Sequence, residues 1–257
     1  MPRRTPLSTP ESDPRACSAG ARVNALHRVS FFAPLDHDAL RRIDAHTSMR
    51  AIDADEAVYF AGRPAERLYV VATGAVKLTS MTSDGTTVLL DVLGSGDFLG
   101  TLPALGGETY GETAWALTPG CLLSFTAGAF DAVLREHPSV ARDALAAMGA
   151  RLRAAQERSG RSAVSSAPAR VASALLVLGE RLGTVDGDRV LIDVPLARED
   201  LASLAGCAPE TVSRSLAAWS REGVVETGRR WVALRRPAAL ADIAGVESAL
   251  AVGDPLP

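Results

Sequence analysis

The chain has 257 residues, of which 47% are hydrophobic and 22% charged, a balance that fits two soluble globular domains and excludes a fibrous or wholly disordered protein. Its formal net charge of −3 gives no chain-wide basic character, although a DNA-binding surface needs only local positive charge. No run of 18 apolar residues indicates a membrane span, and the three separated cysteines (Cys17, Cys121 and Cys207) fit a reducing cytoplasm better than a disulfide framework.

The N-terminal half divides into a tail and a predicted globular domain. Residues 1–24 are rich in proline and lack an apolar core, which predicts a disordered tail. In the domain that we place at 25–137, the first part predicts short helices interrupted at Pro34. Alternating apolar segments then follow between 51 and 125, separated by turn signals such as Asp84-Gly85. They predict an antiparallel sandwich or roll, and with the helices an α+β fold.

Residues 138–164 predict a dimerisation helix followed by a hinge. Small and apolar side chains recur there at alternating spacings of four and three, which is the seam of a paired helix: Ala141, Leu145, Met148, Leu152 and Ala155. The alternative is an amphipathic helix packed on its own domain. We favour a homodimer, because pairing with a second copy hides the seam of both chains from water.

The segment 165–246 predicts a DNA-binding domain, and 247–257 a second tail. A helix from the N-cap Ser166 to about Gly183 is followed by a turn over GTVDGDR. Next come two helices separated by a tight turn at Gly206, the second opened by Pro209. The spacing of Leu201, Val212 and other apolar residues buries one face of this pair. The pattern is typical of a helix-turn-helix.

The second of these helices carries the candidate base contacts. Glu210, Ser213 and Arg214 lie on its exposed face near the N-terminal end, which is the end that meets base edges in the major groove. Arginine can bond guanine O6 and N7 together, and glutamate can accept from cytosine N4. The alternative is a solvated helix pair with an internal bond between Glu210 and Arg214.

A predicted two-stranded wing with Gly228 at its turn follows. Six arginines and three acids between 206 and 236 give this region a local net charge of +3. We therefore expect DNA phosphate contacts from Thr211, Arg221, Arg229 and Arg230, with Arg235 and Arg236 as further candidates. No nucleophile–base motif, metal-ligand cluster or phosphate-binding loop occurs, so the sequence predicts neither an enzyme nor a metal site.

Taken in order, several segments resemble the CRP/FNR family of bacterial regulators from about Leu26 to Ala244. They are LYVVATGAVKL, Asp84-Gly85, GSGDFLG, ETAWAL, RVASALLVL, LAREDLASLAGCAPETVSRSL and EGVV. The resemblance implies a β-roll sensor domain, a long dimer helix and a winged helix-turn-helix that binds a palindromic operator, with RNA polymerase as a further partner. ETVSR looks like the FNR branch, which implies TTGA-like half-sites.

The candidate effector pocket departs from the cyclic AMP site that the resemblance implies. That site resembles G-E-L followed by R-S-A, with a helix threonine on the adenine. This chain has Gly100-Thr101-Leu102 and Glu112-Thr113-Ala114, and the helix positions are Leu152 and Ala155. Because Glu112 stands where an arginine binds the phosphate, we disfavour cyclic AMP.

Other cofactors have weaker support. A [4Fe–4S] cluster needs four thiolates and the chain has three cysteines, so we disfavour it and expect Cys121 to be an ordinary buried residue. Four histidines (His27, His37, His46 and His137) leave a haem ligand open. No cofactor is predicted and the effector is unknown; a cyclic-nucleotide- or haem-responsive regulator is the alternative.

Overall fold

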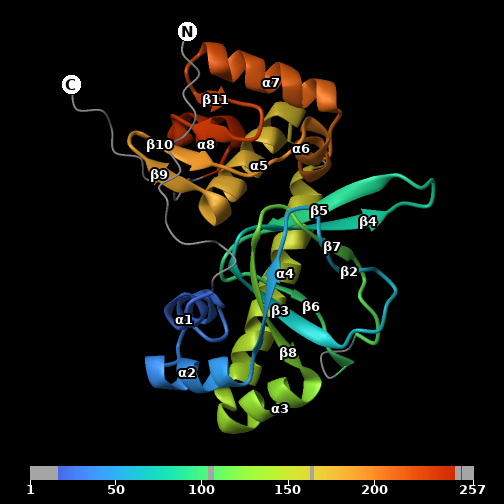
Figure 1. Cartoon of the computed structure of the whole chain (residues 1–257). Coiled ribbons are helices and arrows are strands. Elements are labelled where there is room, and N and C mark those ends of the chain that lie inside the picture. Colours follow the sequence, from blue (N-terminus) through green and yellow to red (C-terminus); the bar gives the residue numbers. More distant parts are fainter. Residues whose placement is uncertain (1–16, 104–106, 163–164, 247–249, 251–257) are drawn as a thin grey trace.

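The computed structural model describes residues 17–103, 107–162, 165–246 and 250. Figure 1 shows a sensor domain of helices and two sheets, a long helix α4, and a C-terminal domain of helices with a small sheet. This confirms the expected α+β class with a roll and a winged helix-turn-helix.

Two capped helices open the described chain. Helix α1 (Ala19–Arg28) has Ser18 as its N-cap, and α2 (His37–Ala45) has Asp36, each side chain accepting a backbone N–H of the first turn. Helix α1 therefore begins inside the segment 1–24 that we expected to be a tail. It is held there because Val23 is buried and the Arg22 guanidinium pairs with Asp44 at 2.8 Å.

The sensor domain is built from two four-stranded antiparallel sheets. The first has the order β1-β8-β3-β6 and the second β2-β7-β4-β5. The strands are β1 (Ser48–Ile52), β2 (Ala57–Tyr59), β3 (Arg67–Thr73), β4 (Val76–Met81), β5 (Thr87–Leu93), β6 (Phe98–Gly100), β7 (Thr113–Ala116) and β8 (Gly120–Thr126). Alternating side chains of both sheets share one core, which includes Val71, Ala114 and Leu122.

The roll ends in α3 (Ala127–Glu136), and α4 (Ser139–Ser162) then runs toward the C-terminal domain (Figure 1). In this single chain, Leu145 of the predicted seam is 71% exposed and Leu152 61% exposed, whereas Met148 is half-buried. The side chain of Ala155 lies outside the described residues. None of the helices in the described part of the chain is long and apolar enough to cross a membrane.

The C-terminal domain combines four helices with a four-stranded sheet of order β11-β12-β10-β9. Its elements are α5 (Ala167–Leu182), β9 (Thr184–Asp186), β10 (Arg189–Ile192), α6 (Arg198–Ala205), α7 (Pro209–Arg221), β11 (Val225–Thr227), β12 (Val232–Leu234) and α8 (Pro237–Ala244). The GTVDGDR segment is not merely a turn. It forms most of the β9–β10 hairpin, because β10 pairs with the wing strand β12 and extends its sheet.

The two domains are in contact. Strand β5 packs against α6, and Leu89 and Val92 share an apolar cluster with Leu175 and Leu201 of the C-terminal domain. Beside this cluster, the Arg181 guanidinium lies 2.8 Å from the Asp91 carboxylate.

Candidate DNA interface and sensor site

The helix-turn-helix comprises α6, the turn at Gly206 and α7. Gly206 has φ +57°, the left-handed conformation that ends α6 as a C-cap glycine should. Pro209 lies in the first turn of α7, where its missing N–H costs no hydrogen bond. Val212, Leu216 and Trp219 are buried, which fixes the face that α7 turns toward its own domain.

The opposite face of α7 carries the predicted base contacts. Glu210, Ser213 and Arg214 are all exposed, and α7 lies on the outer side of the domain (Figure 1). Arg214 donates one hydrogen bond, to the hydroxyl of Thr211 at 3.3 Å. Among the described residues, no ion pair joins Glu210 to Arg214. The structure therefore does not contain the internal bond between these two side chains that the alternative interpretation requires. Both side chains are available to a ligand.

An arginine that the sequence analysis did not single out holds the turn in place. Arg170, on α5, donates three hydrogen bonds to backbone carbonyl oxygens: 2.7 Å to Ala205, 2.8 Å to Gly206 and 2.7 Å to Ser165. It thereby joins the start of α5 to the turn that orients α7. No local sequence signal indicates this role, because the two carbonyls of the turn belong to residues 35 and 36 positions along the chain.

The wing forms as expected, with Gly228 at its turn. Its backbone N–H donates to the Trp231 carbonyl at 3.0 Å, and a side-chain carbon at Gly228 would lie 2.3 Å from the Trp231 ring. Glycine is therefore required for the close approach of the ring.

The basic residues around the wing fall into two groups. Arg235 is not a free phosphate contact, because it pairs with Asp188 (2.6 Å) and Glu226 (3.0 Å). Arg236 donates to the carbonyl oxygen of Glu222. In contrast, Arg221, Arg229 and Arg230 are exposed, and Arg221 donates only to a carbonyl of its own helix. Thr211 is half-buried beside Arg214.

In the sensor domain, aromatic side chains fill the space beside the Gly100 turn. Tyr59 and Tyr110 are buried and stacked, with ring centroids 3.9 Å apart. A side-chain carbon at Gly100 would lie 3.1 Å from the Tyr110 ring and 3.5 Å from the Tyr59 ring. The Tyr110 hydroxyl bonds the backbone of Arg67. Tyr59 lies on β2 and Tyr110 in the loop before β7, and no local pattern in the sequence indicates that they meet.

Glu112 belongs to this cluster. Its Oε1 accepts the Tyr59 hydroxyl at 2.7 Å. Burial, reinforced by this bond to the carboxylate, raises the pKa of Tyr59 far above its ordinary value, so the hydroxyl remains a donor. Tyr59 therefore lies beside both Gly100 and Glu112.

The other expected pocket residues are less closely associated. The Thr113 hydroxyl accepts from the backbone N–H of Ala61, and Leu102 is fully buried. Thr101 is half-buried. Leu152 is exposed on α4, so it lines no enclosed pocket of this single chain.

Two of the cysteines lie closer together than their separation in the sequence suggests. Cys121 is buried, as expected, but it is not isolated: its thiol is within hydrogen-bonding reach of the Cys17 thiol, and burial raises the pKa of both.

Among the described residues, no group of three or more His, Cys, Asp or Glu is arranged to hold a metal ion. Of the histidines left open as haem ligands, His46 lies 3.3 Å from Glu136, and His137 has a buried Nε2.

Comparisons with known proteins agree with this architecture. Residues 49–137 match the model of the cyclic nucleotide-binding domain, and residues 169–243 match that of the Crp-like helix-turn-helix domain. These two domains in one chain define a DNA-binding transcription regulator rather than an enzyme.

Among its relatives, the cyclic AMP receptor protein of Thermus thermophilus is 33% identical over 188 residues, which are 73% of this chain and 83% of that protein. The chain belongs to the CRP/FNR family. A CRP-like cAMP-activated global transcriptional regulator of Mycobacterium tuberculosis is 26% identical over 77% of this chain and 88% of its own length. The structure of FixK2 from Bradyrhizobium japonicum aligns with a TM-score of 0.67 and 27% identity, covering 80% of this chain and 98% of that one.

Proposed function

We propose that this regulator acts as a homodimer in the bacterial cytoplasm and binds palindromic operators through α7, with half-sites related to TTGA. The observation that carries the proposal is the exposed row of Glu210, Ser213 and Arg214 at the N-terminal end of α7, free of internal ion pairs in the described structure. One arginine and one glutamate in this place can distinguish guanine and cytosine from the other bases. Arg221, Arg229, Arg230 and Thr211 then contact phosphates, and RNA polymerase is the expected protein partner.

Dimerisation through α4 is supported by two exposed leucines. Leu145 and Leu152 lie two helical turns apart, and each is more than half exposed in the single chain. Covering a leucine side chain contributes about 1.5–3 kcal/mol, and a twofold pair of helices covers four of them. A twofold dimer would also present two copies of α7, one for each half of a palindrome, whose half-sites lie about one turn of DNA apart.

We further propose that cyclic AMP is not the effector, although two relatives carry names that refer to it. The ring stack of Tyr59 and Tyr110 fills the space beside Gly100, and Glu112 is the charged group beside it. At about 4 Å and an effective dielectric constant of about 20, a carboxylate and a phosphodiester repel by about 4 kcal/mol. That energy corresponds to nearly a thousandfold in affinity.

The test of DNA recognition is fluorescence anisotropy with a labelled duplex that carries two TTGA half-sites as a palindrome. The control duplex has one half-site scrambled. A dimer that contacts both half-sites should bind the control at least about a hundredfold more weakly, because every mismatched base pair costs about 1–3 kcal/mol. Equal affinity for the two duplexes would overturn the proposed operator.

A further inference from the structure

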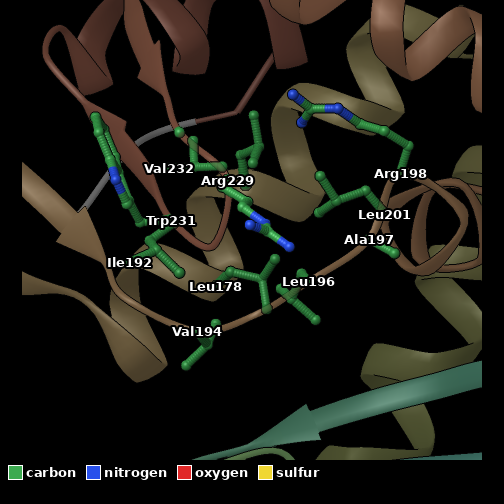
Figure 2. A pocket seen from close by; sticks show the side chains of 12 residues that line it. Leu178, Ile192, Val194, Leu196, Ala197, Arg198, Leu201, Arg229, Trp231 and Val232 are labelled. Carbon is green, nitrogen blue, oxygen red and sulfur yellow. The ribbon is translucent and has the colours of Figure 1, made fainter. Parts of the chain in front are cut away.

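The DNA-binding domain contains a pocket of its own, apart from α7 and from the sensor. Its volume is about 280 Å³, and it lies between α5, β10, the start of α6 and the wing. Apolar side chains form most of its wall, among them Leu178, Ile192, Val194, Leu196, Leu201 and Val232 (Figure 2). A cavity of about 150 Å³ already accepts a benzene molecule, so this one has room for a somewhat larger apolar body.

Two arginines and no acidic residue complete the lining. Arg198 is in the first turn of α6 and Arg229 in the wing turn. Figure 2 shows the Arg229 side chain reaching across the apolar walls, with Arg198 at the rim. In the part of the chain that the structure describes, neither guanidinium has a hydrogen-bond or ion-pair partner. In contrast, Arg189 and Arg235 of the same domain are both paired with acidic side chains.

Two acidic side chains near the pocket are engaged elsewhere, and two others, Asp193 and Glu199, are exposed and do not line it. Asp200, in the first turn of α6, accepts the backbone N–H of Ala197 at 2.8 Å. Glu226, on the wing strand β11, is bound by Arg189 and Arg235. The charged side chains that line the cavity itself are therefore both positive.

We propose that this pocket is an effector site for a small amphipathic monocarboxylate, whose apolar body enters the cavity while its carboxylate bonds Arg198 and Arg229. A planar carboxylate matches the fork of a guanidinium and can bond it through both oxygens. A cation is excluded by the two arginines, and a neutral molecule of the same shape leaves them unpaired. Pockets of this kind combine apolar walls with a few placed polar groups that fix orientation.

Such a ligand has a consequence for DNA binding, and this part rests on the proposed function. Arg229 is one of the side chains assigned to phosphate contacts. A carboxylate that pairs with it removes one phosphate contact per protomer, or two per dimer. The slope of log affinity against log salt should then become less steep by about two, since each contact contributes about 0.9. The ligand would act as a negative regulator.

The binding test needs no DNA and uses the full chain. Isothermal titration calorimetry with octanoate, below its micelle-forming concentration, should show saturable binding. Octan-1-ol should bind at least about tenfold more weakly, because it cannot make charge-assisted bonds, and octyltrimethylammonium should not bind. Absence of saturable octanoate binding, or binding of the cation with equal strength, would overturn the proposal.

Variants assign the site. Arg198→Gln and Arg229→Gln should each weaken octanoate about tenfold or more while leaving octan-1-ol unaffected. Arg135→Gln, an equal loss of charge at an exposed position of α3, is the matched control and should bind octanoate like the unmodified chain. Equal octanoate affinity in all three variants would place binding elsewhere and refute the site. If octanoate binds as expected but the chain fails to recognise any operator, the pocket stands and the proposed function falls.

Discussion

Removing the guanidinium of Arg170 should loosen the helix-turn-helix without unfolding the sensor domain. The three carbonyl bonds of this side chain, at 2.7–2.8 Å, connect α5 to the turn between α6 and α7. Hydrogen bonds to charged groups contribute about 1.5–3 kcal/mol each, but these three share one partly exposed guanidinium. We therefore expect Arg170→Met, which keeps the apolar stem, to cost about 2–4 kcal/mol of local stability.

Hydrogen–deuterium exchange read by mass spectrometry measures this change where it occurs. A loss of 2–4 kcal/mol makes the amides of α6 and α7 exchange about 30-fold to about 900-fold faster, provided that local opening controls their exchange. Peptides from the sensor sheets should be unchanged. Arg135→Met serves as the control, because it removes the guanidinium of an exposed arginine on α3. If α6 and α7 exchange at the same rate in Arg170→Met as in the unmodified chain, the assigned role of Arg170 is wrong.

Three further predictions concern the dimer, DNA contacts and the sensor. Replacing Leu145 and Leu152 together by glutamate should give monomers in light scattering and weaken operator binding, because the exposed apolar seam becomes charged. A dimer that persists in this double variant would contradict the α4 interface. Arg214→Ala should cost about 1–3 kcal/mol of binding free energy on the operator and relax the preference for one base pair. Arg230→Ala should weaken binding to specific and random DNA alike and reduce the slope of log affinity against log salt by about one. Equal losses of affinity on both DNAs for Arg214→Ala would show that this arginine contacts no base. Cyclic AMP should give no saturable heat at micromolar concentration, because of Glu112; a low-micromolar dissociation constant together with enhanced DNA binding would restore cyclic AMP as the effector.

The elements with strong local signals were predictable from the sequence. Ser166, Gly206 and Pro209 each mark a helix boundary through a cap, a left-handed turn or a first-turn proline, and the structure has those boundaries at these residues. The exposed face of α7 follows from the same reasoning, since burial of Val212 and Leu216 at helical spacing leaves Arg214 outside.

Features that depend on distant contacts were not predictable. Tyr59 meets Tyr110 and Glu112 only because β2 pairs with β7, a pairing that no local pattern specifies. The same holds for Cys17 and Cys121, which look isolated in the sequence and are neighbours in the fold.

Two differences from the prediction arise where contacts made in the fold outweigh the local composition. Glycine and aspartate make up four of the seven residues of GTVDGDR, so the sequence predicts only a turn there, whereas pairing with the wing strand β12 stabilises the β9–β10 hairpin. Helix α1 begins before the expected start of the sensor domain, because the Ser18 cap and the Arg22–Asp44 pair order a segment that its composition would leave disordered.

The most direct test of the central claim is selection of operators from random-sequence DNA, carried out in parallel with the unmodified chain and with Arg214→Ala. The account predicts that the unmodified chain enriches a palindrome of two identical half-sites centred about one helical turn apart, each with an invariant guanine–cytosine pair. The Arg214→Ala chain should enrich the same palindrome with that pair relaxed and the other positions retained. Enrichment of no palindrome by the unmodified chain, or of an identical motif by both chains, would contradict DNA recognition through α7.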